Sequence, residues 1–292
     1  MPKAKTPSRN ITTKQFRLGS TLIKAGVFLS IGVAIISTFY LIGYILVQGV
    51  PNLTSQLFEW EYSSENASLI PALINTVVMT FGALLVACPV GIFAAVYLTQ
   101  YTSTRSRFVH IVQIAAETLT GIPSIVYGLF GMLMFVTFFG WGYSLLAGVC
   151  TLAIMVLPLI MRATEEALLA VDPTFREASF GLGAGKTRTI FKVLLPAASG
   201  GILSGIILAV GRIVGETAAL IFTAGTVAQV ATSAFSSART LSVHMYALSS
   251  EGLFVKQAYA TAVVLLILVI IINAVSALLS RKLANTGSSN EE

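Results

Sequence analysis

The chain has 292 residues, of which 55% are hydrophobic and only 10% charged, and its mean hydropathy is +0.86. A soluble globular protein of this length needs more polar surface than these residues supply, so this class is excluded. The net charge of +6 does not indicate nucleic-acid binding, because the basic residues lie in the tails and in alternate polar connections. We therefore expect an integral membrane protein that sits in a lipid bilayer and binds no nucleic acid.

Six apolar stretches each come close to the roughly 20 residues that a helix needs to cross a bilayer. The alternating strands that a membrane barrel requires are not visible. The first stretch exceeds the roughly 7 to 15 apolar residues of a signal peptide, so we expect it to be retained as a transmembrane helix. The predicted transmembrane helices of this all-α integral membrane protein are 25–47, 70–99, 113–138, 143–161, 197–224 and 258–280.

Fifteen of the eighteen lysine and arginine residues lie before the first stretch, after the last, or in every second connection. By the positive-inside rule, this pattern predicts that both termini are cytoplasmic. The predicted organisation is a basic tail 1–24, an external loop 48–69, a core 70–280 with a cytoplasmic loop 162–196, and a tail 281–292.

The predicted external loop is acidic and aromatic and contains no basic residue. Two interpretations stay open: an interfacial aromatic belt, or a docking surface for an external partner. The side chains concerned are Glu59, Trp60, Glu61, Tyr62 and Glu65.

The third stretch contains Gly121 and Pro123. Proline breaks the helical hydrogen-bond ladder and frees the carbonyl near Leu119, which a membrane tolerates only where protein or a polar cavity satisfies it. We expect this break to line a pathway through the membrane. Glu117, one turn into the same stretch, is expected to reach the cytoplasmic interface.

The connection 162–196 is the longest polar insertion. Asp172 and Pro173 match a helix N-cap followed by proline at the first helical position, and Gly181 can help to end that helix. An exposed short helix with an apolar face is suited to docking on a soluble partner. The expected face is Phe175, Ser179 and Leu182, and a second helix is predicted over Lys186–Leu195.

The run Gly185-Lys186-Thr187 resembles the end of a phosphate-binding loop. The spacing rejects that function, because Phe180 stands where the first glycine is required and no buried strand leads into the segment. If ATP powers this protein, another chain binds it.

The fifth stretch carries Arg212 and Glu216, which are one turn apart and so are expected to share a helix face. At about 1.5 Å per residue, Arg212 lies near or slightly beyond the bilayer midplane. A guanidinium stays charged and matches the oxygens of an oxyanion, so one interpretation is a contact with transported substrate. The alternative is a structural ion pair that fixes the helix and never touches substrate.

The remaining candidates for chemistry carry little signal. Cys88 and Cys150 lie in apolar stretches and are expected to pack as small hydrophobic residues. His110 and His244 lie in predicted loops without ligand-like spacing, and we expect both to be solvated. The sequence therefore predicts no metal, no cofactor and no catalytic residues.

The cytoplasmic connection resembles the signature loop of ABC importer permeases, which reads Glu-Ala-Ala, three residues, Gly, nine residues, Ile-x-Leu-Pro. Ser179 replaces the third small residue and Val193 the isoleucine. In that family the short helix of this loop fits a groove on the ATPase and transmits its motion. The matching residues are Glu177, Ala178, Gly183, Leu195 and Pro196.

Three further runs resemble phosphate-specific permeases of the PstA family, and with the loop the resemblance covers nearly all of 70–280. They are Thr120–Gly131, Arg162–Glu166 and Gly211–Thr217. The resemblance implies a type I importer fold with a five-helix core plus an N-terminal helix, in the inner membrane of a bacterium. It implicates Arg212 in phosphate passage and places an important arginine at 162. We add the hypothesis that Glu216 neutralises Arg212 between turnovers.

The resemblance also implies partners: a sister permease PstC, two copies of the ATPase PstB, and the external phosphate-binding protein PstS. The chain would then pass inorganic phosphate by alternating access and would not itself be an enzyme. A permease of the same architecture for sulfate or molybdate is the nearest alternative. A secondary transporter that works alone would leave the loop 162–196 unexplained.

Overall fold

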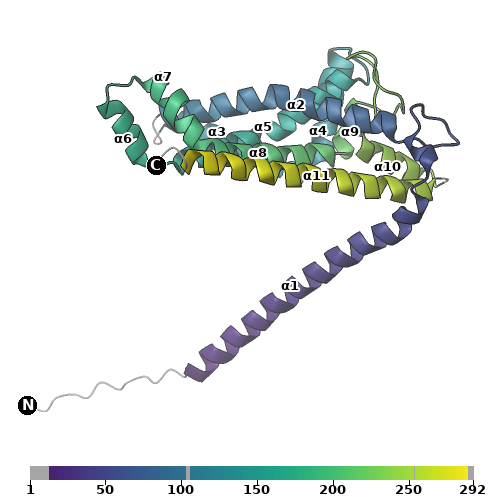
Figure 1. Cartoon of the computed structure of the whole chain (residues 1–292), viewed down its shortest axis with the longest axis horizontal. Helices are drawn as coiled ribbons and strands as arrows, with labels where there is room; N and C mark the ends of the chain where they lie inside the picture. Colours follow the sequence, from purple (N-terminus) through teal and green to yellow (C-terminus); the bar gives the residue numbers. More distant parts are fainter. Residues whose placement is uncertain (1–12, 103–105, 253, 289–292) are drawn as a thin grey trace, which may run out of the picture. The chain divides into compact units, whose positions relative to one another are not determined.

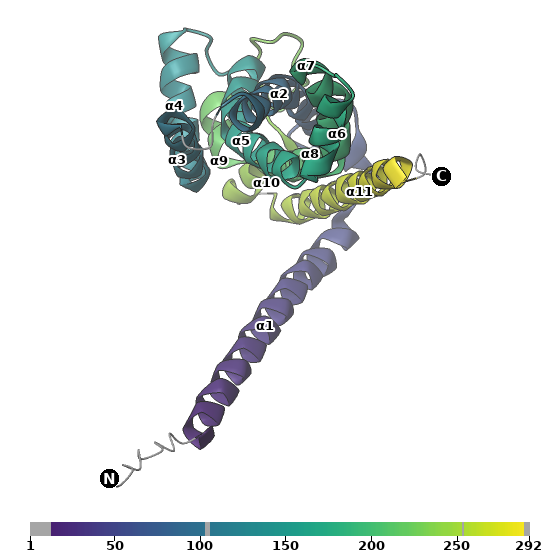
Figure 2. The same ribbon diagram turned by 90° about the vertical axis from the view of Figure 1, so that its left-hand side faces the viewer.

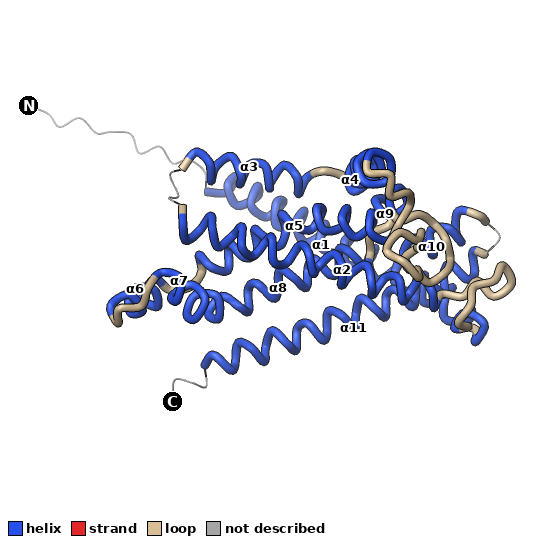
Figure 3. The backbone as a smooth tube through the Cα atoms, turned by 90° about the horizontal axis from the view of Figure 1, so that it is seen from above, coloured by secondary structure: helices blue, strands red, loops and turns tan. Residues whose placement is uncertain are grey.

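The computed structural model describes residues 13–102, 106–252 and 254–288. The predicted tails therefore fall partly outside it, at 1–12 and 289–292. The described chain consists of helices and loops, with no strand in these ranges (Figure 3). It forms two compact units, Met1–Gln48 and Gly49–Glu292.

The first unit is the long helix α1, Thr13–Gly49. From Ser20 onward nearly every side chain is exposed, including large apolar ones such as Phe28 and Phe39. Its hydroxyl groups bond to carbonyls one turn back, as Thr38 does to Ala34 at 2.8 Å, and so need no water. A helix that is apolar on all sides is suited to a bilayer.

The second unit is a helical bundle whose long members are α2, α3, α5, α8 and α11, with short helices at both ends (Figure 1). Bounds, in chain order, are η1 Val50–Asn52, η2 Ser55–Phe58, α2 Ile70–Val96, η3 Tyr97–Tyr101, α3 Arg107–Gly121, α4 Ser124–Gly131, η4 Met132–Phe138, α5 Leu145–Leu169, α6 Pro173–Gly181, α7 Lys186–Thr189, η5 Ile190–Leu194, α8 Leu195–Val214, α9 Ala218–Thr223, α10 Leu241–Ser250 and α11 Val255–Ser288.

Helix α5 is the centre of the bundle, and α3 and α11 lie at opposite edges (Figure 2). Small residues let its neighbours approach. Gly201 and Gly205 of α8 lie against Ala167 and Ala163 of α5, where an added Cβ would collide with the alanine side chains. The small-residue surface of the fifth stretch therefore packs on α5, as close helix contacts in membranes require.

Five described helical segments are long and apolar enough to cross a membrane, or six if the bent pair α3 and α4 counts as one crossing. The helix break predicted at Gly121 and Pro123 separates the two members of this pair, and its bend of 102° means that the stretch 113–138 is not one straight helix. Ile122 and Pro123 are extended, as proline and the residue before it favour. The carbonyl of Leu119 accepts a hydrogen bond of 2.8 Å from the Tyr127 hydroxyl, so protein satisfies this carbonyl at the break.

Two further boundaries differ from those predicted. Helix α5 runs on to Leu169, so Arg162 lies two turns inside it and does not end it. The helix predicted over Lys186–Leu195 is not separate, because α7, η5 and α8 form one helical segment from Lys186 to Val214. Pro196 cannot donate a backbone hydrogen bond, and the π-helical segment η5 directly before α8 absorbs this irregularity.

Candidate functional site

The fifth stretch is broken between Arg212 and Glu216. Helix α8 ends at Val214 and α9 begins at Ala218, so the prediction that the two charged residues share one continuous helix face is wrong. The Glu216 carboxylate accepts a hydrogen bond of 3.0 Å from the backbone N–H of Ala219. A carboxylate there satisfies a free donor at a helix start and favours the helix dipole. Glu216 therefore holds the first turn of α9.

The Glu216 backbone is fixed as well. Its carbonyl accepts a hydrogen bond of 2.5 Å from the Ser242 hydroxyl of α10, and only 8% of the residue is exposed. The break is thus tied to a helix 26 residues further along the chain. This tertiary contact explains why an apolar sequence stretch does not continue as one helix.

Arg212 is half-buried in the last turn of α8 and forms no ion pair with Glu216. Among the described side chains, the ion pair present joins Arg162 and Glu117. The next residue, Ile213, packs in one core cluster with Tyr127 and Ile122, which places the last turn of α8 near the break between α3 and α4. Among the described residues, Arg212 is thus a cation without an ion-pair partner, in a region where two apolar stretches are interrupted.

The second halves of the two interrupted stretches pack on each other. Gly128 of α4 lies so close to α9 that an added Cβ would stand 2.8 Å from the Cα of Ala219. Gly131 of α4 is packed in the same way against Thr223. The break at Gly121 and Pro123 and the break beside Arg212 therefore belong to one region of the bundle, at the end that carries α10 (Figure 1).

Arg162 lies elsewhere. Its Nη1 is 2.7 Å from Oε1 of Glu117, and the two side chains are 39% and 61% exposed. The next residue, Ala163, packs against Gly205 of α8, which precedes Arg212 by about 10 Å along the helix axis. The structure therefore does not bring the two predicted pathway arginines together.

The connection 162–196 folds largely as its local signals predict. The Asp172 carboxylate accepts hydrogen bonds from the backbone N–H and the hydroxyl of Thr174, at 2.8 and 2.7 Å, and these bonds lower the pKa of Asp172 below its usual value. Helix α6 ends at Gly181, and Gly183 adopts a φ of +79°, where glycine carries no steric cost. Ser179 reaches across to Thr189 with a hydroxyl-to-hydroxyl distance of 2.8 Å, which joins α6 to α7.

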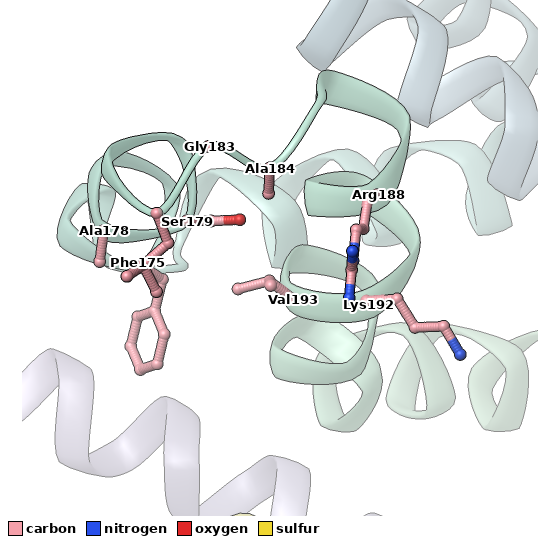
Figure 4. Close-up of a pocket in the computed structure, with 9 residues that line it drawn as sticks. Phe175, Ala178, Ser179, Gly183, Ala184, Arg188, Lys192 and Val193 are labelled. Carbon is pink, nitrogen blue, oxygen red and sulfur yellow. The ribbon is translucent and has the colours of Figure 1, made fainter.

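A pocket of about 530 Å³ lies between α6 and the segment formed by α7 and η5 (Figure 4). The predicted residues Ala178, Ser179 and Gly183 line it, while Glu177, Leu195 and Pro196 do not. Two basic side chains, Arg188 and Lys192, also line the pocket. The sequence analysis does not assign them to a site, although their spacing of one helical turn is visible in the sequence. The lining residues are Phe175, Ala178, Ser179, Leu182, Gly183, Ala184, Arg188, Lys192 and Val193.

At the opposite end, the predicted loop 48–69 forms an ordered layer in which Leu57 and Leu69 pack with Leu241 of α10. His244 of α10 is completely buried, so the prediction that it is solvated is wrong. Its Nε2 lies 3.3 Å from the carbonyl oxygen of Ala67. Burial, and then the nearby positive charge of Arg239, lower the pKa of His244 from 6.5 to about 3, so the ring is neutral.

Comparison with known families gives one match. The model of the family described as "Binding-protein-dependent transport system inner membrane component" matches residues 87–285. This range holds the breaks, both predicted pathway arginines and the whole α6–α7 connection.

Individual relatives agree. The chain is 33% identical over 228 residues to the probable ABC transporter permease protein YqgI of Bacillus subtilis, which covers 73% of this chain and 77% of the relative. It is 33% identical over 225 residues to phosphate transport system permease protein PstA 2 of Mycobacterium tuberculosis, and the match covers 77% of this chain and 74% of the relative. For the phosphate transport system permease protein PstA of Haemophilus influenzae, identity is 34% over 203 residues, with 68% and 70% covered.

Solved structures share the fold. An inward-facing methionine ABC transporter, MetNI, gives a TM-score of 0.58 at 22% identity, with 74% of this chain and 94% of the other covered. A bacterial alginate ABC transporter gives a TM-score of 0.62 at 14% identity, and the match covers 91% of this chain and 98% of the other. The predicted all-α importer permease fold is confirmed.

Proposed function

Because the chain belongs to the family of binding-protein-dependent transport system inner membrane components, we propose that it moves inorganic phosphate as the permease subunit of an ATP-driven importer. The assignment of phosphate as the substrate rests on the sequence identity of 33 to 34% with phosphate transport system permeases over most of the chain. The protein is a multi-pass protein of the inner membrane. It is a transport component, and ATP hydrolysis belongs to separate ATPase subunits.

Arg212 is the residue that we assign to the passing anion. It is half-buried, forms no ion pair with Glu216, and precedes Ile213, which packs with Ile122 and Tyr127 at the break between α3 and α4. A guanidinium in such a place attracts an oxyanion and can bind two of its oxygens. The hydrogen bond of Glu216 to α9 supports a positioning role for this carboxylate, in place of neutralising Arg212 between turnovers.

Gly121 and Pro123 are proposed to line the same pathway, because their break lies beside Arg212. Arg162 is proposed to lie on the exit route, as a weaker contributor. Its charge is already compensated by Glu117, and an exposed ion pair of this kind has a small free energy, about 0–1 kcal/mol.

Helix α6 is proposed to dock on the ATPase. Phe175 and Leu182 are 47% and 90% exposed, although both are apolar, and a partner surface would cover them. We therefore place the α6–α7 connection and both termini in the cytoplasm, and α10 on the outside. The partners proposed are a sister permease of the PstC type, two ATPase copies of the PstB type, and a phosphate-binding protein of the PstS type.

The test is uptake of radiolabelled phosphate, with sulfate in parallel, by cells that lack this subunit. The cells receive the wild-type chain, Arg212→Gln, or the control Lys256→Gln, which removes one exposed positive charge elsewhere, at equal membrane levels. We expect the wild type and the control to restore phosphate uptake, and Arg212→Gln to restore none. Restoration of sulfate alone would reject the substrate, restoration by Arg212→Gln would reject the role of this arginine, and uptake without the ATPase would reject the importer.

A further inference from the structure

Arg239 is a buried cation in the segment between α9 and α10. Only 4% of it is exposed, and its guanidinium carbon lies 4.7 Å from the centre of the Tyr62 ring. The main chain is fixed on both sides, because its N–H donates to Val227 O at 3.1 Å and its carbonyl accepts from Asn75 Nδ2 at 3.3 Å. The side chain is therefore held inside the protein by the fold.

One edge of the guanidinium lacks hydrogen-bond partners. Its Nε and Nη2 are buried and form no hydrogen bond, and no described carboxylate lies within ion-pair distance. These two nitrogens form one edge of the guanidinium, which offers two parallel N–H groups to a pair of oxygens. The Tyr62 ring contacts the charge, but two buried N–H groups without acceptors and without a carboxylate are unfavourable, so this edge calls for an anion.

His244 supplies a second unpartnered nitrogen. Its Nε2 faces the carbonyl of Ala67, which can only accept, so Nε2 carries the proton and Nδ1 is an acceptor. Nδ1 is buried and forms no hydrogen bond. The imidazole packs edge-on against the Tyr62 ring, with the ring centres 6.0 Å apart, so His244 and Arg239 share one aromatic neighbour.

We propose that Arg239 and His244 form a buried site for a small inorganic oxyanion that carries a proton, such as hydrogen phosphate. The Nε and Nη2 groups of Arg239 donate to two oxygens of the anion. The hydroxyl of the anion donates to Nδ1 of His244. This site is separate from Arg212 and does not depend on the proposed transport.

The chemistry of the three nitrogens selects the ligand. Sulfate carries no proton at neutral pH and has nothing to donate to Nδ1, and chloride cannot span both donors of the guanidinium edge. A carboxylate of a partner protein has no access to side chains that are 4% and 0% exposed. The entrance is proposed to be the surface pocket of about 340 Å³ that Glu61, Tyr62 and Gln229 help to line, since Tyr62 covers Arg239.

The experiment measures binding of radiolabelled inorganic phosphate to the full-length chain in lipid nanodiscs at pH 7, by equilibrium dialysis. Every sample carries Arg212→Gln, which removes the other proposed anion contact. Arg239→Lys keeps the charge but loses the two-donor edge, and Arg107→Lys is the matched control on an exposed arginine at the start of α3. We expect Arg239→Lys to raise the Kd at least tenfold and the control to leave it unchanged.

His244→Gln is the second variant, because a glutamine amide can still donate to Ala67 but removes the Nδ1 acceptor. We expect sulfate to compete at least tenfold more weakly than phosphate, and this preference to disappear in His244→Gln. Absence of phosphate binding in the Arg212→Gln chain, or an unchanged Kd in Arg239→Lys, would overturn the site. Equal competition by sulfate and phosphate before His244 is changed would overturn the protonated ligand.

Discussion

Acidification should destabilise the end of the bundle that carries α10, through His244. The unfolded chain binds a proton at this residue near pH 6.5, whereas the folded chain resists protonation down to about pH 3. Stability is therefore full above pH 6.5 and is lost as the pH falls toward 3, because only the unfolded state gains the proton. At pH 5 the difference of about 1.5 pH units below 6.5 corresponds to a loss of about 2 kcal/mol.

The assay is thermal and denaturant unfolding of the detergent-solubilised chain between pH 7 and 5, followed by tryptophan fluorescence. Trp60 belongs to the loop whose Ala67 carbonyl is hydrogen-bonded to His244, so its emission reports this region. The control is His244→Gln, which cannot titrate but can keep the hydrogen bond to Ala67. We expect the wild type to lose about 2 kcal/mol more than the variant between pH 7 and 5. Equal losses in both chains would refute the buried neutral histidine.

Three further outcomes follow from packing and charge. Gly205→Leu should lower stability by about 1–3 kcal/mol or more, because the side chain would enter the contact between α5 and α8; thermal unfolding measures this. Tyr127→Phe should cost about 0.5–1.5 kcal/mol in the same assay, since it removes the hydroxyl hydrogen bond to the Leu119 carbonyl and leaves the Ile122 N–H as the donor to that carbonyl. Arg162→Gln should retain more phosphate uptake than Arg212→Gln, because only Arg162 is charge-compensated.

Each outcome has its control. Gly200→Leu faces open space and should leave stability nearly unchanged, so an equal loss there would show that the glycine contact does not matter. An unchanged melting temperature for Tyr127→Phe would show that the Tyr127 hydroxyl does not stabilise the break between α3 and α4. Equal uptake by the two arginine variants would remove the distinction between a paired and an unpaired cation.

Local signals made the α6–α7 connection predictable. Asp172, Pro173 and Gly183 act within one turn of their own positions, so capping chemistry in the sequence carries over to the structure. Pro123 likewise marks the α3–α4 break, although the angle of 102° does not follow from proline alone, because α4 also packs on α9.

Tertiary contacts decided what the sequence pattern missed. The run around Glu216 is apolar enough to continue a helix, and its break depends on Ser242, which lies in another helix. His244 looks like a loop histidine until the chain brings Ala67, 177 residues away, onto its ring. The sequence predicts that the fourth helix ends at residue 161, where hydropathy falls, yet α5 continues to Leu169 because the following residues are good helix formers.

The helical segment from Lys186 to Val214 runs through the bundle for 29 residues and is about 43 Å long. Arg188 and Lys192 stand at one end, in the wall of the α6 pocket, and Arg212 stands at the other. Each residue of an α-helix turns the chain by about 100°, so the angular position of Arg212 is fixed by the number of residues that separate it from the pocket. A displacement of α6 would therefore reach the two helix breaks along one helical segment, in which the π-helical part η5 departs from α-helical geometry.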